Sequence, residues 1–266
     1  MALRALAAPT PLESPREQHV QTMRVELSDG AATTVYAAHY PVAEFTLSAT
    51  RLPRPAPLAA FCQERGIDDA IVGGFYVRPQ GTPLGELRTR GVARRFVPFD
   101  GPWDGRRACV HIVGTEVRIA RRDALPAQPV GDLLQAGPLL VRDGAVVSGD
   151  DEGFSAGARQ FDSDITAGRY PRAALGAGEG GLIAVACDGR APQDAGLTIA
   201  ELAELMLALG AGEALNLDGG GSTSLVAGGQ LRNRPRESHG IDIAGGRAVS
   251  TALVFTPRGG SAVTSG

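Results

Sequence analysis

The chain has 266 residues, enough for one large or two small domains with a sizeable core, and no linker-like segment divides it. Its 43% hydrophobic and 21% charged residues are typical of a soluble globular protein, and a net charge of -3 without a long basic run argues against nucleic-acid binding. No apolar stretch approaches the roughly 20 residues of a membrane helix. The start, residues 1–8, is a poor secretory signal, so we expect a cytoplasmic protein that binds no membrane.

Glycine and cysteine usage indicates a strand-rich body with free thiols. The 36 glycines are about twice the usual share, judged against roughly 7%, and imply many tight turns. Cys62, Cys109 and Cys187 are widely spaced without a CxxC pair, and two of them lie in apolar runs where a buried, inert thiol is expected. None of the four histidines pair at ligand spacing, and we predict no metal or cofactor.

The first part of the chain is predicted to form an arm, a hairpin and a short helix. Residues 1–18, rich in alanine, proline and charge, are interpreted as a flexible arm. His19–Leu27 and Thr33–Tyr40 are predicted strands of one hairpin. Leu58–Arg65 is a predicted helix that ends at Gly66.

Asp69–Tyr76 is a predicted buried strand that runs into the pair Gly73 and Gly74. Two interpretations of this pair stay open: it borders a substrate site, or it only permits close packing of the backbone. The charged stretch 78–95 is expected to run over the surface and to border the site.

The middle of the chain predicts two more hairpins. Arg107–Val113 and Glu116–Ala120 form the first, and the stretch 121–136 is expected to be irregular. Gly137–Val147 gives a strand, an Asp-Gly turn and a strand. The acidic stretch 150–166 lacks the full calcium-loop spacing and is interpreted as a solvated loop.

A predicted crossover brings two aspartates to neighbouring strand ends. Leu182–Cys187 is a continuous apolar run, hence a central strand, and it ends at Asp188. A capping box at Thr198 then begins a helix. A right-handed crossover through this helix would place the next apolar strand, which ends at Asp218, near the first.

The most distinctive stretch of the chain follows that last strand. It reads Asn216-Leu217-Asp218-Gly219-Gly220-Gly221-Ser222. Consecutive glycines allow a tight turn whose amides point to one place, which suits an anion, while the strand holds the carboxylate of Asp218 beside it. No lysine follows the glycines and the spacing is not G-x-G-x-x-G, so a nucleoside triphosphatase or a dinucleotide enzyme is not expected.

This stretch resembles the signature of the phosphodiester glycosidase family, whose animal member removes N-acetylglucosamine from phosphodiester-linked mannose. Further matches in the expected order are the glycine pair after 69–72, Gly137-Pro138 with its Asp-Gly turn, Arg172 in a P-R-x-A element, and the closing strand with Arg247. The chain departs from the family at Val72, where asparagine is usual, and at Ala173, where threonine is usual.

The residue pattern and the resemblance together predict an α+β fold. We expect a single domain, residues 19–256, with a mixed, largely antiparallel twisted sheet system and packed helices, followed by a flexible tail at 257–266. The sequence predicts no oligomeric state.

The resemblance implies hydrolysis of a sugar-1-phosphodiester at the glycosidic bond. Asp218 would be nucleophile, stabiliser or base, Asp188 its partner, and Arg172 the phosphate clamp. Residues expected to bind the substrate or its phosphate are Gly73, Gly74, Arg190, Asn216, Gly219, Gly220, Gly221, Ser222 and Arg247. Two alternatives stay open: a glycan or phospho-sugar binding module without turnover, suggested by Val72 and Ala173, and a metal-dependent phosphodiesterase.

Overall fold

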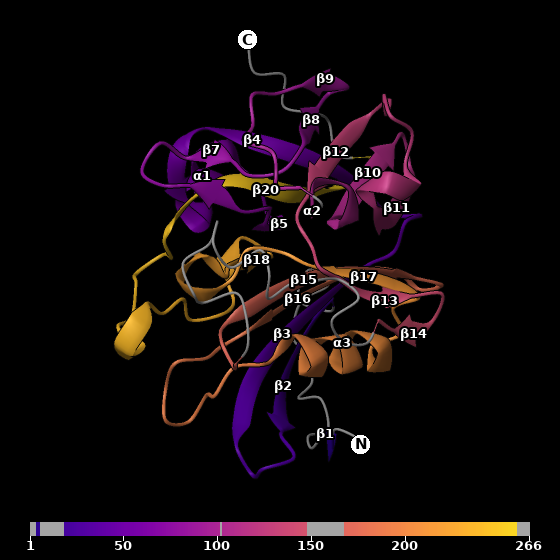
Figure 1. Ribbon diagram of the computed structural model, residues 1–266. Coiled ribbons are helices and arrows are strands. Elements are labelled where there is room, and N and C mark those ends of the chain that lie inside the picture. Colours follow the sequence, from indigo (N-terminus) through magenta and orange to yellow (C-terminus); the bar gives the residue numbers. More distant parts are fainter. Residues whose placement is uncertain (1–3, 6–18, 102, 148–167, 260–266) are drawn as a thin grey trace.

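The computed structural model describes residues 4–5, 19–101, 103–147 and 168–259. Three larger sheets and one two-stranded sheet make up most of this part, and all pairings between its named strands are antiparallel. Figure 1 shows an eight-stranded sheet in the lower half and the other sheets in the upper half. The antiparallel sheet system is therefore confirmed, whereas helices contribute less than an α+β class implies.

The eight-stranded sheet has the order β1-β2-β3-β16-β15-β17-β13-β14. Its strands are β1 (Arg4–Ala5), β2 (Val20–Glu26), β3 (Ala32–Tyr40), β13 (Leu139–Arg142), β14 (Ala145–Val146), β15 (Arg172–Gly178), β16 (Gly181–Cys187) and β17 (Glu213–Asn216). Helix α3 (Ile199–Ala208) covers its outer face, as Figure 1 shows, and buries Leu202 and Met206 there.

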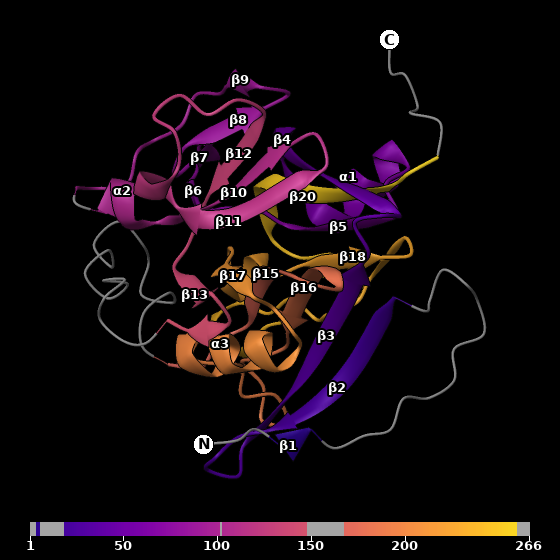
Figure 2. The same ribbon diagram turned by 90° about the vertical axis from the view of Figure 1, so that its right-hand side faces the viewer.

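A five-stranded sheet faces the inner side of the eight-stranded sheet in Figures 1 and 2. Its order is β19-β18-β5-β20-β4, with β4 (Phe45–Pro57), β5 (Asp69–Val72), β18 (Leu225–Ala227), β19 (Gln230–Leu231) and β20 (Ala248–Pro257). Strand β4 was not expected from the sequence because it contains three prolines. It lies at the sheet edge, where a missing N–H costs no ladder hydrogen bond.

The remaining sheets lie beside it. The second five-stranded sheet has the order β11-β10-β12-β8-β9, with β8 (Leu87–Thr89), β9 (Val92–Ala93), β10 (Ala108–Val113), β11 (Glu116–Arg121) and β12 (Asp132–Gln135), and β6 (Tyr76–Val77) pairs with β7 (Thr82–Pro83). Two expectations are corrected here. The stretch 121–136 contains strand β12, and the stretch 78–95 is more than a surface excursion, because Leu87 is buried in this sheet.

The other helices are short. They are α1 (Leu58–Arg65), α2 (Trp103–Arg106), and the 3-10 turns η1 (Arg122–Ala124), η5 (Gly220–Ser222) and η6 (Ser238–Gly240). Helix α1 ends at Gly66 as predicted, in the left-handed conformation with φ 62° that glycine adopts readily. No helix in the described ranges is long and apolar enough to span a membrane.

One hydrophobic cluster joins all three larger sheets. It contains Leu175 and Leu215 from the eight-stranded sheet, Ile71 and Leu225 from the sheet opposite, and Leu134 from β12. Burial of this many apolar side chains is the main contribution to stability. It also fixes β5 against β17, the two strands whose ends carry the motifs.

Several sequence predictions are confirmed. The hairpins β2–β3, β10–β11 and β13–β14 form, and Thr198 and Glu201 complete the capping box of α3. All three cysteines are free and buried. In the predicted arm, 1–18, the structure describes only β1, which pairs with β2, and in the predicted tail it describes 257–259. The predicted acidic loop, 150–166, lies outside the described residues.

Candidate active site

The glycine pair at 73–74 and the triglycine loop at 219–221 meet between the two facing sheets. Strand β17 ends at Asn216, and two residues later the amide of Asp218 donates a 3.0 Å hydrogen bond to the carbonyl of Gly73, which follows β5. Asp218 is thus held from both sheets at once.

The carboxyl group of Asp218 is nearly buried among polar side chains. Its exposed fraction is 9%, and its Oδ1 accepts a 2.9 Å hydrogen bond from the amide of Gly219. Burial raises the pKa of Asp218 to about 6, against the opposing effects of the Ser222 hydroxyl, the Gly219 amide and the charges of Arg247 and Arg78. Such a shift is typical of carboxyl groups in functional sites.

Two hydroxyl groups accompany Asp218. The Oγ of Ser222 is buried and has no hydrogen bond of ordinary geometry among the described residues. Tyr76 is half-buried, donates a 2.7 Å hydrogen bond to the carbonyl of Ala248, and has a raised pKa because of burial and the charge of Asp218. Both hydroxyl groups thus lie close enough to Asp218 to interact with its carboxyl group.

The triglycine loop uses most of its amides within the protein. Gly220 donates to the carbonyl of Pro171 at 2.8 Å, and the amides of Ser222 and Thr223 close the η5 turn. Gly220 has φ 61°, which explains why glycine stands there. The loop therefore holds Asp218 in place more than it offers a set of free amides to an anion.

Close packing explains the glycine pair. A Cβ at Gly73 would lie 2.5 Å from Oγ1 of Thr251, and a Cβ at Gly74 would lie 2.8 Å from the carbonyl oxygen of Gln135. Both distances are too short for any side chain, so this geometry supports the packing interpretation. The position beside Asp218 keeps the pair at the site as well.

Three arginines gather around one carboxylate next to Asp218. The Nε of Arg247 donates to Oε1 of Glu237 at 2.6 Å, its Nη2 donates to Oε2, and Nη1 of Arg190 lies 3.8 Å from the same Oε2. The charges of Arg247, Arg190 and Arg78 all lower the pKa of Glu237, that of Arg247 most strongly. Three cations against Glu237 and Asp218 leave a net positive site, which suits a phosphate.

The structure places Arg172 differently from the expected phosphate clamp. Its guanidinium is 2% exposed, and Nε and Nη2 donate to the carbonyls of Leu197 and Gly168 at 2.8 and 3.1 Å. Desolvation lowers its pKa to about 10. Its backbone lies beside Gly219, but the charges that act on Asp218 belong to Arg247 and Arg78. The role of Arg172 as clamp stays a prediction.

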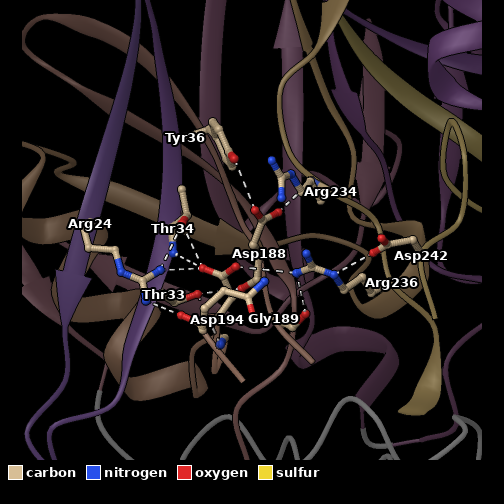
Figure 3. Close-up of polar contacts among 12 residues, drawn as sticks. Arg24, Thr33, Thr34, Tyr36, Asp188, Gly189, Asp194, Arg234, Arg236 and Asp242 are labelled. Atoms are coloured by element: carbon tan, nitrogen blue, oxygen red, sulfur yellow. Dashed lines mark hydrogen bonds and ion pairs between the residues drawn. The ribbon is translucent and has the colours of Figure 1, made fainter. Parts of the chain in front are cut away.

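Asp188 and Asp218 follow β16 and β17 at the same end of the eight-stranded sheet, with β15 between those two strands. Strand β15 pairs with both β16 and β17, so the two aspartates follow parallel strands, separated by two strand spacings of about 4.8 Å each. The predicted connection of these two strands through α3 is present, but the strands are not neighbours as expected, because β15 lies between them. The carboxylate of Asp188, however, is 2% exposed and is hydrogen-bonded to Tyr36 and to the amide of Arg234, as Figure 3 shows. Burial raises its pKa.

Three other residues singled out in the sequence lie inside the fold. Asn216 is 1% exposed, and its Nδ2 donates to the carbonyl of Leu217 while Oδ1 has no partner among the described residues. Val72 and Ala173, the departures from the family pattern, are fully buried in the core between the sheets. Both therefore replace a polar side chain at a position that is solvent-free here.

Sequence reasoning missed Glu237. It stands in an irregular loop without a motif, ten residues before its partner Arg247, and only the fold brings the two together. In the sequence, Tyr76 was only the last residue of a predicted strand, and Arg78 was only the start of a stretch expected to border the site. Among the described residues, no group of three or more His, Cys, Asp or Glu side chains is placed to hold a metal ion.

Comparisons with known proteins show the family of the chain. The sequence profile of the phosphodiester glycosidase family matches residues 66–256, and the chain belongs to that family. A comparison with curated protein sequences gave no match.

Three solved structures share the fold. A zebrafish N-acetylglucosamine-1-phosphodiester alpha-N-acetylglucosaminidase catalytic domain, auto-inhibited by its pro-peptide, is similar with a TM-score of 0.67 and 20% identity over 97% of this chain and 89% of that one. A hypothetical protein from Synechocystis gives 0.61 and 20% over 91% and 62%. A putative exported protein from Burkholderia pseudomallei gives 0.55 and 16% over 89% and 74%.

Proposed function

We propose that this protein is a hydrolase that cleaves the C1–O bond of a sugar-1-phosphodiester, of the N-acetylglucosamine-1-phosphodiester type, to free sugar and a phosphomonoester. Family membership supports the reaction class. The observation that carries the proposal is the juxtaposition of Asp218 with the arginine cluster, which we define as Arg78, Arg190 and Arg247 around Glu237.

The arginine cluster binds the phosphate in this proposal. A phosphodiester carries one negative charge, and the phosphomonoester that leaves gains a second. The guanidinium of Arg247 is fixed through Nε and Nη2 by Glu237, so it is already oriented when charge develops on the leaving group. Preorganised cations at developing charge lower the barrier more than they tighten ground-state binding.

Asp218 acts at the anomeric carbon. With a pKa of about 6, roughly nine-tenths of its carboxyl groups are ionised at pH 7. The carboxylate stabilises positive charge at C1 or attacks it, the C1–O bond breaks, and the bridging oxygen leaves with the phosphate. Water then supplies the hydroxyl of the free sugar. Because a phosphate is a good leaving group, a strong general acid is not required.

The two departures from the family pattern do not weaken this proposal. Val72 and Ala173 belong to the hydrophobic core and have no exposed surface. Apolar side chains there fit their surroundings, whereas the polar groups beside Asp218 come from Tyr76 and Ser222. The assay below distinguishes this proposal from a binding module without turnover.

The test is an assay of purified protein with N-acetylglucosamine-1-phosphodiesters. We expect free sugar and phosphomonoester from the unmodified protein and no turnover from Asp218→Asn. Binding without turnover would favour the binding module. Release of sugar phosphate, sensitive to a chelator, would favour a metal-dependent phosphodiesterase.

A further inference from the structure

The connection from β19 to β20 contains Glu237 and Arg247 of the arginine cluster. Hydrogen bonds anchor this connection to the eight-stranded sheet. We call residues 232–247 the 232–247 loop. It contains Glu237, and its last residue is Arg247, whose amide donates to the carbonyl of Gly221 at 3.0 Å. A Cβ at Gly221 would lie 2.9 Å from Oε1 of Glu237, so the carboxylate packs directly on the triglycine loop.

The first anchor of this loop is Asp188. Its Oδ1 accepts a 2.6 Å hydrogen bond from the amide of Arg234, and its Oδ2 accepts a 3.2 Å bond from the hydroxyl of Tyr36 in β3. Its amide and carbonyl are bonded to Thr34 and Thr33 of the same strand. Both carboxylate oxygens of Asp188 accept hydrogen bonds within the protein, and the residue is 2% exposed. Its carboxylate is therefore poorly placed to contact a substrate.

The second anchor is the buried side chain of Arg236, two residues beyond Arg234. Its Nη1 donates to the carbonyl of Gly189 at 3.4 Å and lies 3.6 Å from Oδ2 of Asp194, and its Nε donates to Asp242 within the loop at 2.8 Å. Arg24 and Thr34 hold Asp194 from the other side. Figure 3 shows this network joining β2, β3 and the loop.

The anchors surround the residue that orients Arg247. Glu237 directly follows Arg236, and its amide donates to the carbonyl of Ile241 at 2.8 Å. A loop tethered at 234 and 236 has little freedom at 237, and positional errors of about 1 Å at a binding group cost large factors in rate.

We propose that Asp188 is a positioning residue that anchors the 232–247 loop, and thereby Glu237 and Arg247, rather than a catalytic partner of Asp218. The inference rests on the proposed function for its link to turnover. The anchoring itself depends only on the contacts of Asp188.

The Asp188→Asn variant separates anchoring from proton transfer. Its Oδ1 accepts from the Arg234 amide as before, and its Nδ2 donates to the Tyr36 oxygen, whose own hydrogen turns away. The comparison therefore uses Asp188→Asn, Asp188→Ala and Asp218→Asn, assayed for kcat and KM. We expect Asp188→Asn to keep kcat within about fivefold of the unmodified protein, while Asp188→Ala and Asp218→Asn lose at least about 100-fold. A loss in Asp188→Asn as large as that in Asp218→Asn would overturn the proposal.

Amide hydrogen exchange supplies a readout that needs no turnover. We expect faster exchange over residues 233–247 in Asp188→Ala and unchanged exchange there in Asp188→Asn and Asp218→Asn. Unchanged exchange in Asp188→Ala would overturn the anchoring. If the unmodified protein shows no turnover, the proposed function fails, and the exchange data still decide the anchoring. Should Asp188→Ala fail to fold, Tyr36→Phe takes its place, because it removes one of the two hydrogen bonds of the Asp188 side chain. Normal exchange over residues 233–247 in Tyr36→Phe together with fast exchange in Asp188→Asn would contradict the proposal.

Discussion

The amide of Asp218 donates a 3.0 Å hydrogen bond to the carbonyl of Gly73, which joins two motifs that lie far apart in the sequence. Asp218 follows strand β17 of the eight-stranded sheet, and Gly73 follows strand β5 of the facing five-stranded sheet. The position of the carboxyl group therefore depends on how tightly the two sheets pack, and substitutions at Gly73 test this dependence.

A methyl group at Gly73 is expected to destabilise the fold and to lower activity. The added Cβ would lie 2.5 Å from Oγ1 and 2.9 Å from the carbonyl carbon of Thr251, so the β20 backbone must move. Overpacking of this kind costs about 1–3 kcal/mol in the free energy of unfolding. Denaturant titration of Gly73→Ala measures it.

Gly180→Ala is the matched control. A Cβ at Gly180 meets nothing within 4 Å, so this variant is expected to unfold within about 0.5 kcal/mol of the unmodified protein. Equal stability of the two variants would show that the packing at Gly73 is not tight.

The pH dependence of kcat/KM is expected to report Asp218. The group acts as a carboxylate and its pKa is raised to about 6 by burial, so activity should rise with pH through 6 and level off above it. A profile from pH 4 to 8 on the purified enzyme measures this. A profile that falls as pH rises through 6 would assign the protonated form to the reaction.

The stability of the folded protein should also depend on the ionisation of Asp218, but it should fall with pH where activity rises. Because the folded-state pKa lies above the ordinary aspartate value of 3.8, the folded protein binds more protons than the unfolded chain between about pH 4 and 6. Stability therefore falls as pH rises through this window. Asp218→Asn removes this loss. We expect its gain in unfolding free energy over the unmodified protein to grow by at most about 3 kcal/mol from pH 4 to pH 7.5. A gain in unfolding free energy that does not change with pH would show that burial does not raise the pKa of Asp218.

Glu237→Gln tests preorganisation of Arg247. Removing the carboxylate frees a positive charge for the phosphate but no longer fixes the guanidinium. We expect kcat to fall about tenfold while KM does not rise. Steady-state kinetics measure the split, with the exposed Glu64→Gln on α1 as control. An increase in KM with kcat unchanged would mean that Glu237 contributes to binding alone.

Local patterns predicted the elements whose signals are short-range. The capping box at Thr198, the glycine stop at Gly66 and the Asp-Gly turn at 143–144 each specify geometry through neighbouring residues, and all three formed. Strands β4 and β12 were missed because prolines hide the first and the second is only four residues long. Their pairing partners, not their own residues, make them strands.

The site was predictable where a motif carries it. The sequence placed Asp218, Ser222 and the glycine pair together because each belongs to a recognisable stretch. It gave no sign of Glu237, nor that the guanidinium of Arg172 turns to the carbonyls of Leu197 and Gly168. Those are properties of the tertiary fold, set by contacts between segments far apart in the chain.

Hydrolysis of an N-acetylglucosamine-1-phosphodiester in water enriched in oxygen-18, followed by mass spectrometry of the phosphomonoester, tests the central claim most directly. If Asp218 promotes cleavage of the C1–O bond of the substrate, the bridging oxygen stays on the phosphate and the phosphomonoester should contain no label. Asp218→Asn should yield no product. Labelled phosphomonoester, or unlabelled product formed equally well by Asp218→Asn, would contradict the account.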